Sequence, residues 1–123
     1  MSFVKFKITD DLKKKIKRTL SIISEKRDSK IRKGMNEVTK SIERGQAKFV
    51  VMAEDVSPPE ILYHVPVLCE EKSIPYAYLS TKKELGSAVN INVSSSSVAI
   101  EKAGSGNEKE LDELIKQIKV IKK

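Results

Sequence analysis

Apolar residues recur along this chain at two different spacings. In the first and last parts they fall three to four positions apart, as on one face of an amphipathic helix. The two stripes are Leu12, Ile16, Leu20 and Ile23, and then Leu111, Leu114, Ile115, Ile118 and Ile121. Thr9 precedes two aspartates and is typical of a helix start, because its hydroxyl can cap free N–H groups.

Between these two helices lie short runs that are apolar at every position. The runs cover residues 49–53, 76–79 and 98–100. Such runs are typical of strands that are buried on both faces of a sheet. The polar, basic segment 26–33 has room for one more short strand.

Shorter helices are predicted between the strands. They cover residues 36–44, 59–71 and 82–89. Gly45 suits the C′ position of the first, and Pro66 should kink or restart the second. Helices and strands therefore alternate, which favours a sheet covered by helices on both faces. We predict an α/β fold, a three-layer α-β-α sandwich with helices and strands alternating around a small mixed sheet.

The composition fits one small domain. The chain has 123 residues, no internal repeat and no long linker, so we expect a single domain over residues 1–123. With 39% hydrophobic and only 5% aromatic residues, its core should be aliphatic.

The net charge of +7 is unevenly distributed along the sequence. Residues 1–48 hold 15 Lys and Arg against 6 Asp and Glu, whereas residues 49–123 hold 9 against 11. A clustered basic face attracts polyanions such as nucleic acid. An ordinary solvated basic surface would show the same counts, so charge alone leaves both interpretations open.

The cysteine usage and hydropathy indicate an intracellular protein. Cys69 is the single cysteine, so no intrachain disulfide can form, as is usual in a reducing compartment. Residues 1–5 lack the apolar core of a signal peptide, and no apolar run approaches the roughly 20 residues of a membrane span. We expect a cytoplasmic protein with no membrane partner.

Residues suited to catalysis are scarce. His64 and Cys69 lie five positions apart in a predicted helix, so they do not share a face, and we expect a structural histidine and a core cysteine. One Cys and one His cannot form a metal cluster, and no nucleotide-binding glycine loop is present. The sequence thus predicts no enzyme, catalytic residue, cofactor, metal or small-molecule substrate. The acidic pairs 54–55 and 70–71 are interpreted as solvated surface.

The segment 32–40, RKGMNEVTK, is more informative. It places a glycine and polar side chains at the start of a short helix, where free N–H groups suit a phosphate. Asn36 and Lys40 share a face, with Glu37 beside them. Glu37 can only accept hydrogen bonds, which suits guanine N–H groups whose pairing edges are exposed, as in sheared G·A pairs. The same spacing also fits an asparagine helix cap with a Glu–Lys ion pair.

From about Ile31 to Gly104 the sequence closely resembles the archaeal large-subunit ribosomal protein family called "L-seven-Ae". The motifs GMNEVTK, AEDVSPPEI and LCEEKSIPY occur together in this order. Eukaryotic relatives bind the U4 small nuclear RNA and box C/D guide RNAs. The resemblance implies an α-β-α sandwich that binds kink-turns, which are RNA helices bent sharply at a short bulge beside tandem sheared G·A pairs.

The resemblance also implies roles for individual residues. Asn36, Glu37 and Lys40 would read the guanines, and Lys33 and Gly34 would approach the RNA backbone. The flipped bulge nucleotide would be flanked by Ile61 and by the loop 91–96, that is Ile91, Asn92, Val93, Ser94, Ser95 and Ser96. Lys82 would contact a phosphate.

The chain departs from the family pattern after the fourth predicted helix begins. Relatives read close to LGRAAG, whereas this chain has Ser87 and Asn90 in place of the arginine and the second glycine. Asn tolerates positive φ, so the turn can survive. The serine run 94–97 offers hydroxyls where relatives often have apolar residues, which would alter the preference among kink-turns.

The predicted function is therefore recognition of kink-turn RNA without catalysis. By resemblance, the RNA partners are ribosomal RNA, box C/D and H/ACA guide RNAs and ribonuclease P RNA. Partner proteins of these ribonucleoproteins could dock on Val65 and Val67 of the helix 59–71. The alternatives are a general basic nucleic-acid-binding protein without kink-turn specificity, and an RNA-modifying enzyme or its RNA-binding accessory domain.

Overall fold

The apolar runs and the short basic strand form one sheet in the computed structural model, which describes residues 8–55, 64–91 and 93–122. The strand order is β1-β4-β2-β3. The strands are β1 (Lys30–Lys33), β2 (Phe49–Ala53), β3 (Tyr76–Leu79) and β4 (Ser97–Lys102). Strands β2 and β3 have the predicted bounds, β1 falls within the segment 26–33, and β4 is longer than predicted.

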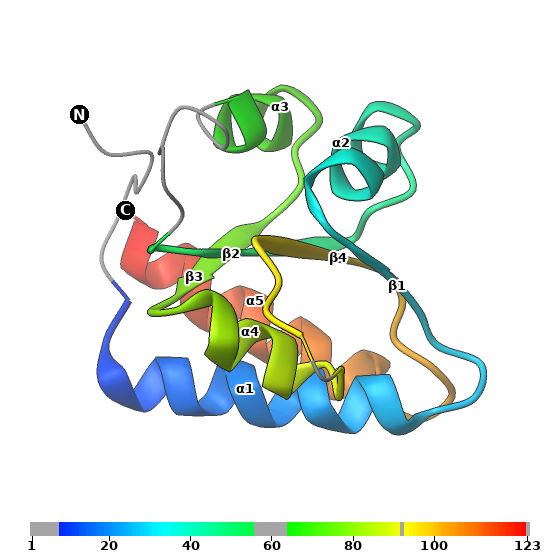
Figure 1. The fold of residues 1–123 in the computed structure, drawn as a ribbon, viewed down its shortest axis with the longest axis vertical. Coiled ribbons are helices and arrows are strands. Elements are labelled where there is room, and N and C mark those ends of the chain that lie inside the picture. The colour runs from blue at the N-terminus through cyan, green and yellow to red at the C-terminus, as the bar shows by residue number, and fades with distance from the viewer. Residues whose placement is uncertain (1–7, 56–63, 92, 123) are drawn as a thin grey trace.

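Helices cover both faces of this sheet. They are α1 (Asp10–Glu25), α2 (Met35–Glu43), α3 (His64–Glu71), α4 (Lys82–Ala88) and α5 (Glu108–Lys122). Figure 1 shows α2 and α3 on one face and α1, α4 and α5 on the other. The predicted three-layer sandwich around a mixed sheet is thus confirmed.

Helix boundaries agree with the sequence signals for capping. Thr9 caps α1, since its Oγ1 accepts a hydrogen bond from the Leu12 N–H at 3.3 Å. Gly45 follows α2 with a φ of 71°, as its predicted C′ place requires. Helix α3 runs from His64 through Pro66 to Glu71 without interruption, and the residues predicted before it, 59–63, lie outside the described part. None of the described helices is long and apolar enough to cross a membrane.

The core is mainly aliphatic, as the composition predicts. All four predicted apolar residues of α1 are at most 6% exposed, and every residue of β2 is buried. Each fully buried large side chain contributes about 1.5–3 kcal/mol relative to an exposed one. Cys69 is fully buried, which confirms its predicted place in the core.

The strand directions bring several segments to one edge of the sheet. Strands β1 and β2 both run antiparallel to β4, and β3 runs parallel to β2. The carboxyl ends of β1, β2 and β3 therefore meet the start of β4. The pairs Lys33 with Val98 and Met52 with Ser97 record this alignment. Helices α2 and α4 both begin at this edge, and the loop before β4 ends there.

Candidate nucleic-acid interface

Helix α2 begins at a glycine whose backbone is specialised. Gly34 is the N-cap, with φ 92° and ψ 151°, a conformation that side-chain-bearing residues rarely adopt. Its N–H donates to the Ser97 carbonyl at 2.9 Å, which fixes the helix start against β4. Within the described residues, no side chain caps this helix. The N–H groups of its first turn are therefore left for an anionic ligand.

The predicted recognition residues lie on this first part of α2. Asn36, Glu37 and Lys40 are all exposed, and Lys33, the last residue of β1, is half-buried beside them. Glu37 forms no ion pair with any described residue. Since Gly34 is the cap and Glu37 is unpaired with Lys40, the alternative of an asparagine cap with a Glu–Lys pair is wrong.

Helix α4 begins at the same edge but is capped by side chains. The Thr81 Oγ1 accepts a hydrogen bond from the Glu84 N–H at 3.0 Å. The Lys82 N–H donates to Asp55 Oδ1 at 2.8 Å. The half-buried Lys82 can therefore offer a phosphate its side chain, while its own backbone N–H is already engaged.

The loop before β4 is held by backbone hydrogen bonds to both α4 and β2. Ser95 donates its N–H to the Lys82 carbonyl at 3.1 Å, and the Ser96 carbonyl accepts from the Ala53 N–H at 2.9 Å. Val93 is 69% exposed and Ser94 is exposed, whereas Ile91 is half-buried against the core. Ile61 and Asn92 lie outside the described residues.

The serine run is less available than the sequence suggests. Ser95 is buried, and its hydroxyl donates to the Ser97 carbonyl at 3.0 Å. The side chain of Ser97 is fully buried as well. The expectation that the whole run offers hydroxyls to a ligand is therefore corrected: Ser95 and Ser97 are buried, Ser96 is half-buried, and Ser94 is exposed.

The departure from the family pattern keeps the turn after α4. Asn90 has a φ of 60°, as expected of an asparagine in a glycine's place, and its side chain donates to the Ser24 hydroxyl of α1. Gly86 lets the loop approach, because a Cβ there would lie 2.1 Å from the Val93 carbonyl oxygen. Ser87 is exposed.

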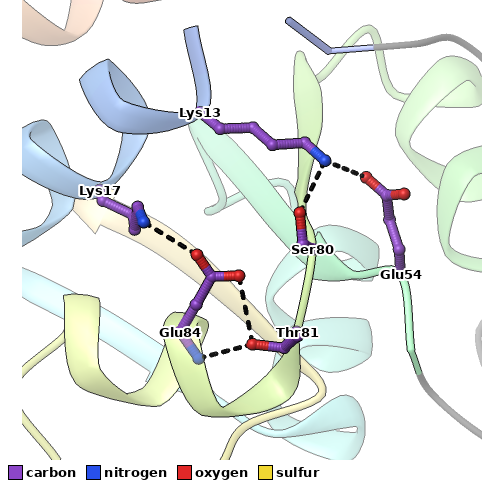
Figure 2. A network of polar contacts seen from close by, with 6 residues as sticks. All are labelled: Lys13, Lys17, Glu54, Ser80, Thr81 and Glu84. Carbon is purple, nitrogen blue, oxygen red and sulfur yellow. Dashed lines mark hydrogen bonds and ion pairs between the residues drawn. The ribbon is translucent and has the colours of Figure 1, made fainter. Parts of the chain in front are cut away.

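Polar contacts hold this edge against α1, as Figure 2 shows. The Lys13 ammonium lies 2.8 Å from Ser80 Oγ and 3.0 Å from a Glu54 oxygen. Lys17 donates to Glu84 at 2.8 Å. This hydrogen bond lowers the pKa of Glu84 below its ordinary value, against the smaller opposing effect of burial.

Two sequence interpretations change as a result. The acidic pair 54–55 is not idle surface, because Glu54 pairs with Lys13 and Asp55 caps α4. The basic exterior predicted for the first helix is partly neutralised, since Lys13 and Lys17 are engaged by carboxylates. The N-terminal excess of positive charge is also divided between both sides of the sheet, with α1 and α2 on opposite faces (Figure 1).

Sequence reasoning missed a buried polar cluster beneath α2. Ser41 Oγ donates to Glu101 Oε2 at 2.6 Å, and Arg32 Nε lies 3.3 Å from the same oxygen. Burial by itself raises the pKa of Glu101, but the hydrogen bonds from Ser41 and Arg32 outweigh it and hold the pKa below its ordinary value. A glutamate in an apolar strand and a serine on the apolar stripe of α2 were the available signals.

Helix α3 flanks α2 on the same face of the sheet. The His64 Nε2 lies 3.2 Å from Thr39 Oγ1, so the histidine links α3 to α2, as a structural histidine would. Of the two valines predicted to dock partner proteins, Val65 is fully buried, which rules it out. Val67 is 46% exposed.

Polar side chains and free backbone donors thus gather at one edge of an α-β-α sandwich, an arrangement suited to a polyanion. Residues 14–110 match the Ribosomal protein L7Ae/L30e/S12e/Gadd45 family. Because the match spans most of the chain, the protein belongs to this family. The recognition made from the sequence motifs is thereby confirmed.

A solved structure supports the same assignment. The Giardia lamblia 15.5kD RNA binding protein matches this chain with a TM-score of 0.85 and 27% sequence identity. The match covers 93% of this chain and 92% of that one. Both comparisons agree with the prediction of a non-enzymatic protein. Among the described residues, no group of three or more His, Cys, Asp or Glu could hold a metal ion.

Proposed function

We propose that this protein acts as one RNA-binding domain that recognises kink-turns through the start of α2. Family membership and the likeness to a protein named as RNA-binding support the RNA part of the proposal. The part of the proposal that concerns kink-turns is supported by one observation, which is the state of the Glu37 side chain. Its carboxylate is exposed in a basic region and pairs with no described cation, so it remains able to accept hydrogen bonds.

The chemistry of the α2 start suits purine edges next to a sharp backbone bend. The uncapped N–H groups after Gly34 can bind a phosphate. Lys40 can donate to guanine O6 or N7, and Asn36 can donate and accept. Glu37 can accept from guanine N1–H and N2–H groups, which are exposed in sheared G·A pairs. A phosphate would be repelled by that carboxylate, so Glu37 favours base contact over backbone contact.

The rest of the edge would hold the RNA around this contact. Lys33, the residue before Gly34, and Lys82, the first residue of α4, are half-buried and would bind phosphates through their side chains. Val93, exposed on the loop before β4, would cover an unstacked bulge base. Ile61 and Asn92, outside the described residues, are proposed for the same bulge on the family resemblance, as are Ile91, Ser94 and Ser96.

Binding of the bent conformer alone would shift the RNA toward that conformer without catalysis. We extend the proposal, on the family resemblance, to kink-turns of ribosomal RNA, box C/D and H/ACA guide RNAs and ribonuclease P RNA. The exposed Val67 of α3 is the proposed contact for partner proteins of such ribonucleoproteins.

A titration with two RNAs tests the proposal. One RNA carries a kink-turn, and the other is identical except that its G·A pairs are replaced by Watson–Crick pairs. We expect tighter binding to the kink-turn at every salt concentration, with both affinities falling as salt rises. Equal affinities would identify a general basic nucleic-acid-binding protein instead. Methyl transfer to RNA by the purified chain would support the modifying-enzyme alternative.

A further inference from the structure

The polar cluster beneath α2 connects three elements through one carboxylate oxygen. Glu101 lies on β4 and is 8% exposed, and its Oε2 accepts from Ser41 of α2 and faces Arg32 of β1. Ser41 is 2% exposed, whereas the Arg32 side chain is 42% exposed. The cluster therefore reaches from the underside of α2 to the solvent beside β1.

Strand β4 holds α2 at two points through these contacts. The Ser97 carbonyl accepts the N–H of Gly34 at the helix start, and Glu101 accepts the Ser41 hydroxyl further along. Ser41 and Glu37 are four positions apart and lie on neighbouring turns of one helix side. Fixing Ser41 therefore also limits the rotation of α2 about its axis, which sets the direction in which the Glu37 side chain leaves the helix.

The contact with Glu101 leaves part of the Arg32 guanidinium able to bind a ligand. Its contact with Glu101 is made by Nε, and the half-exposed guanidinium has further donors on its terminal nitrogens. Arg32 also lies two residues before the N-cap Gly34. A planar guanidinium held in one orientation binds a phosphate through two parallel hydrogen bonds. Lys30 adds positive charge nearby, since its ammonium contributes to lowering the pKa of Glu101.

We propose that Glu101 is a positioning residue for RNA binding, which holds Arg32 as an additional phosphate contact and fixes the rotation of α2 through Ser41. The inference rests on the proposed function, because it concerns the same α2 start. Arg32 touches the RNA backbone in this account, and Glu101 and Ser41 act through their neighbours.

Arginine variants test the phosphate contact. Arg32→Gln should weaken binding to both RNAs of the titration and should reduce the salt slope by about 1, the expectation for one lost phosphate contact. Arg18→Gln is the matched control, because Arg18 is exposed on α1 on the opposite face of the sheet. Equal slopes for wild type and Arg32→Gln would overturn the phosphate contact.

Two variants test the positioning role. Glu101→Gln and Ser41→Ala should each reduce the ratio of kink-turn affinity to control affinity by about fivefold, the scale of one net hydrogen bond. Glu110→Gln removes an exposed carboxylate from α5 and should leave the ratio of the two affinities unchanged. Circular dichroism at the titration temperature would establish that each variant is folded. Ser41→Ala keeps every charge, so it provides the answer if Glu101→Gln does not fold.

A double variant separates positioning from general stability. If Glu101 acts on the backbone contact through Arg32, adding Glu101→Gln to Arg32→Gln should cause no further fall in the salt slope. Folded single variants with unchanged discrimination, while the wild type discriminates, would overturn the positioning role alone. A wild type that binds both RNAs equally would overturn the proposed function and the role of Glu101 with it.

Discussion

Two helices begin at the same edge of the sheet, and they begin differently. Helix α4 has a side-chain cap at Thr81 and a second acceptor at Asp55. Helix α2 begins at Gly34, with no cap from any described side chain. The first-turn donors of α4 are thus used to stabilise the fold, and those of α2 are bonded to no described side chain.

The comparison shows how a helix can be held in place while the backbone N–H groups of its first turn have no side-chain cap. The Thr81 cap joins α4 to its own first turn, whereas α2 is positioned from below, by the Ser97 carbonyl and by Glu101. Of the N–H groups at the start of α2, these contacts occupy that of Gly34 and leave those of the residues after it without a side-chain partner. The two starts can therefore be altered separately, and the effects should differ in kind.

Gly34→Ala should have the largest effect, because it should lower both the stability of the protein and its affinity for the kink-turn RNA. Nothing lies within 4 Å of a Cβ at this position, so the change strains the backbone without a clash. An alanine at φ 92° costs about 1–3 kcal/mol. We expect that loss in the free energy of unfolding, measured by urea denaturation, together with weaker kink-turn binding. Unchanged stability would show that the α2 start does not need this conformation.

Glu37→Ala should weaken kink-turn binding by about 1–3 kcal/mol, the scale of one good base contact. Because Glu37 is exposed, the free energy of unfolding should change by no more than about 0.5 kcal/mol. Glu43→Ala removes an exposed carboxylate from the same helix and is the matched control, with no expected loss of kink-turn preference. Tighter specific binding by Glu37→Ala would identify Glu37 as a merely repulsive charge.

Thr81→Ala should destabilise the protein by about 1 kcal/mol through loss of the α4 cap. The preference for the kink-turn over its Watson–Crick control should stay the same, since this cap serves the fold. Thr9→Ala removes the corresponding cap of α1, on the opposite face of the sheet from α2, and should cost a similar amount in thermal unfolding. A loss of kink-turn preference in Thr81→Ala alone would show that α4 also reads the RNA.

The smallest effect concerns pH. The pKa of Glu101 is lower in the folded chain than in the unfolded one, because Ser41 and Arg32 favour its charged form more than burial opposes it. Its contribution to stability is therefore complete above the unfolded pKa and is lost as pH falls through the folded pKa. As the pH is lowered below about 4.3, the ordinary pKa of a glutamate, the free energy of unfolding should fall more steeply for the wild type than for Glu101→Gln. Parallel curves for the two proteins would contradict this.

Much of the fold could be predicted from local signals. Runs such as FVVMA and YAYL are apolar at every position, so their strand bounds were predicted to the residue. Caps and glycines placed the helix ends within a residue or two at α2 and α4. The polar strand β1 could be predicted only as a possibility, because its pairing with β4, and not its own pattern, makes it a strand.

The candidate site likewise has features that the sequence determined and features that only the tertiary structure decided. The sequence alone determined that the residues of the proposed recognition segment lie together, since Gly34, Asn36, Glu37 and Lys40 are neighbours at one helix start and their spacing sets their common side. Only the tertiary structure decided which lysines remain available and which serines face inward. Lys13 meets Glu54, and Ser41 meets Glu101 60 positions away, because strand pairing joins segments whose distance along the chain carries no information about contact.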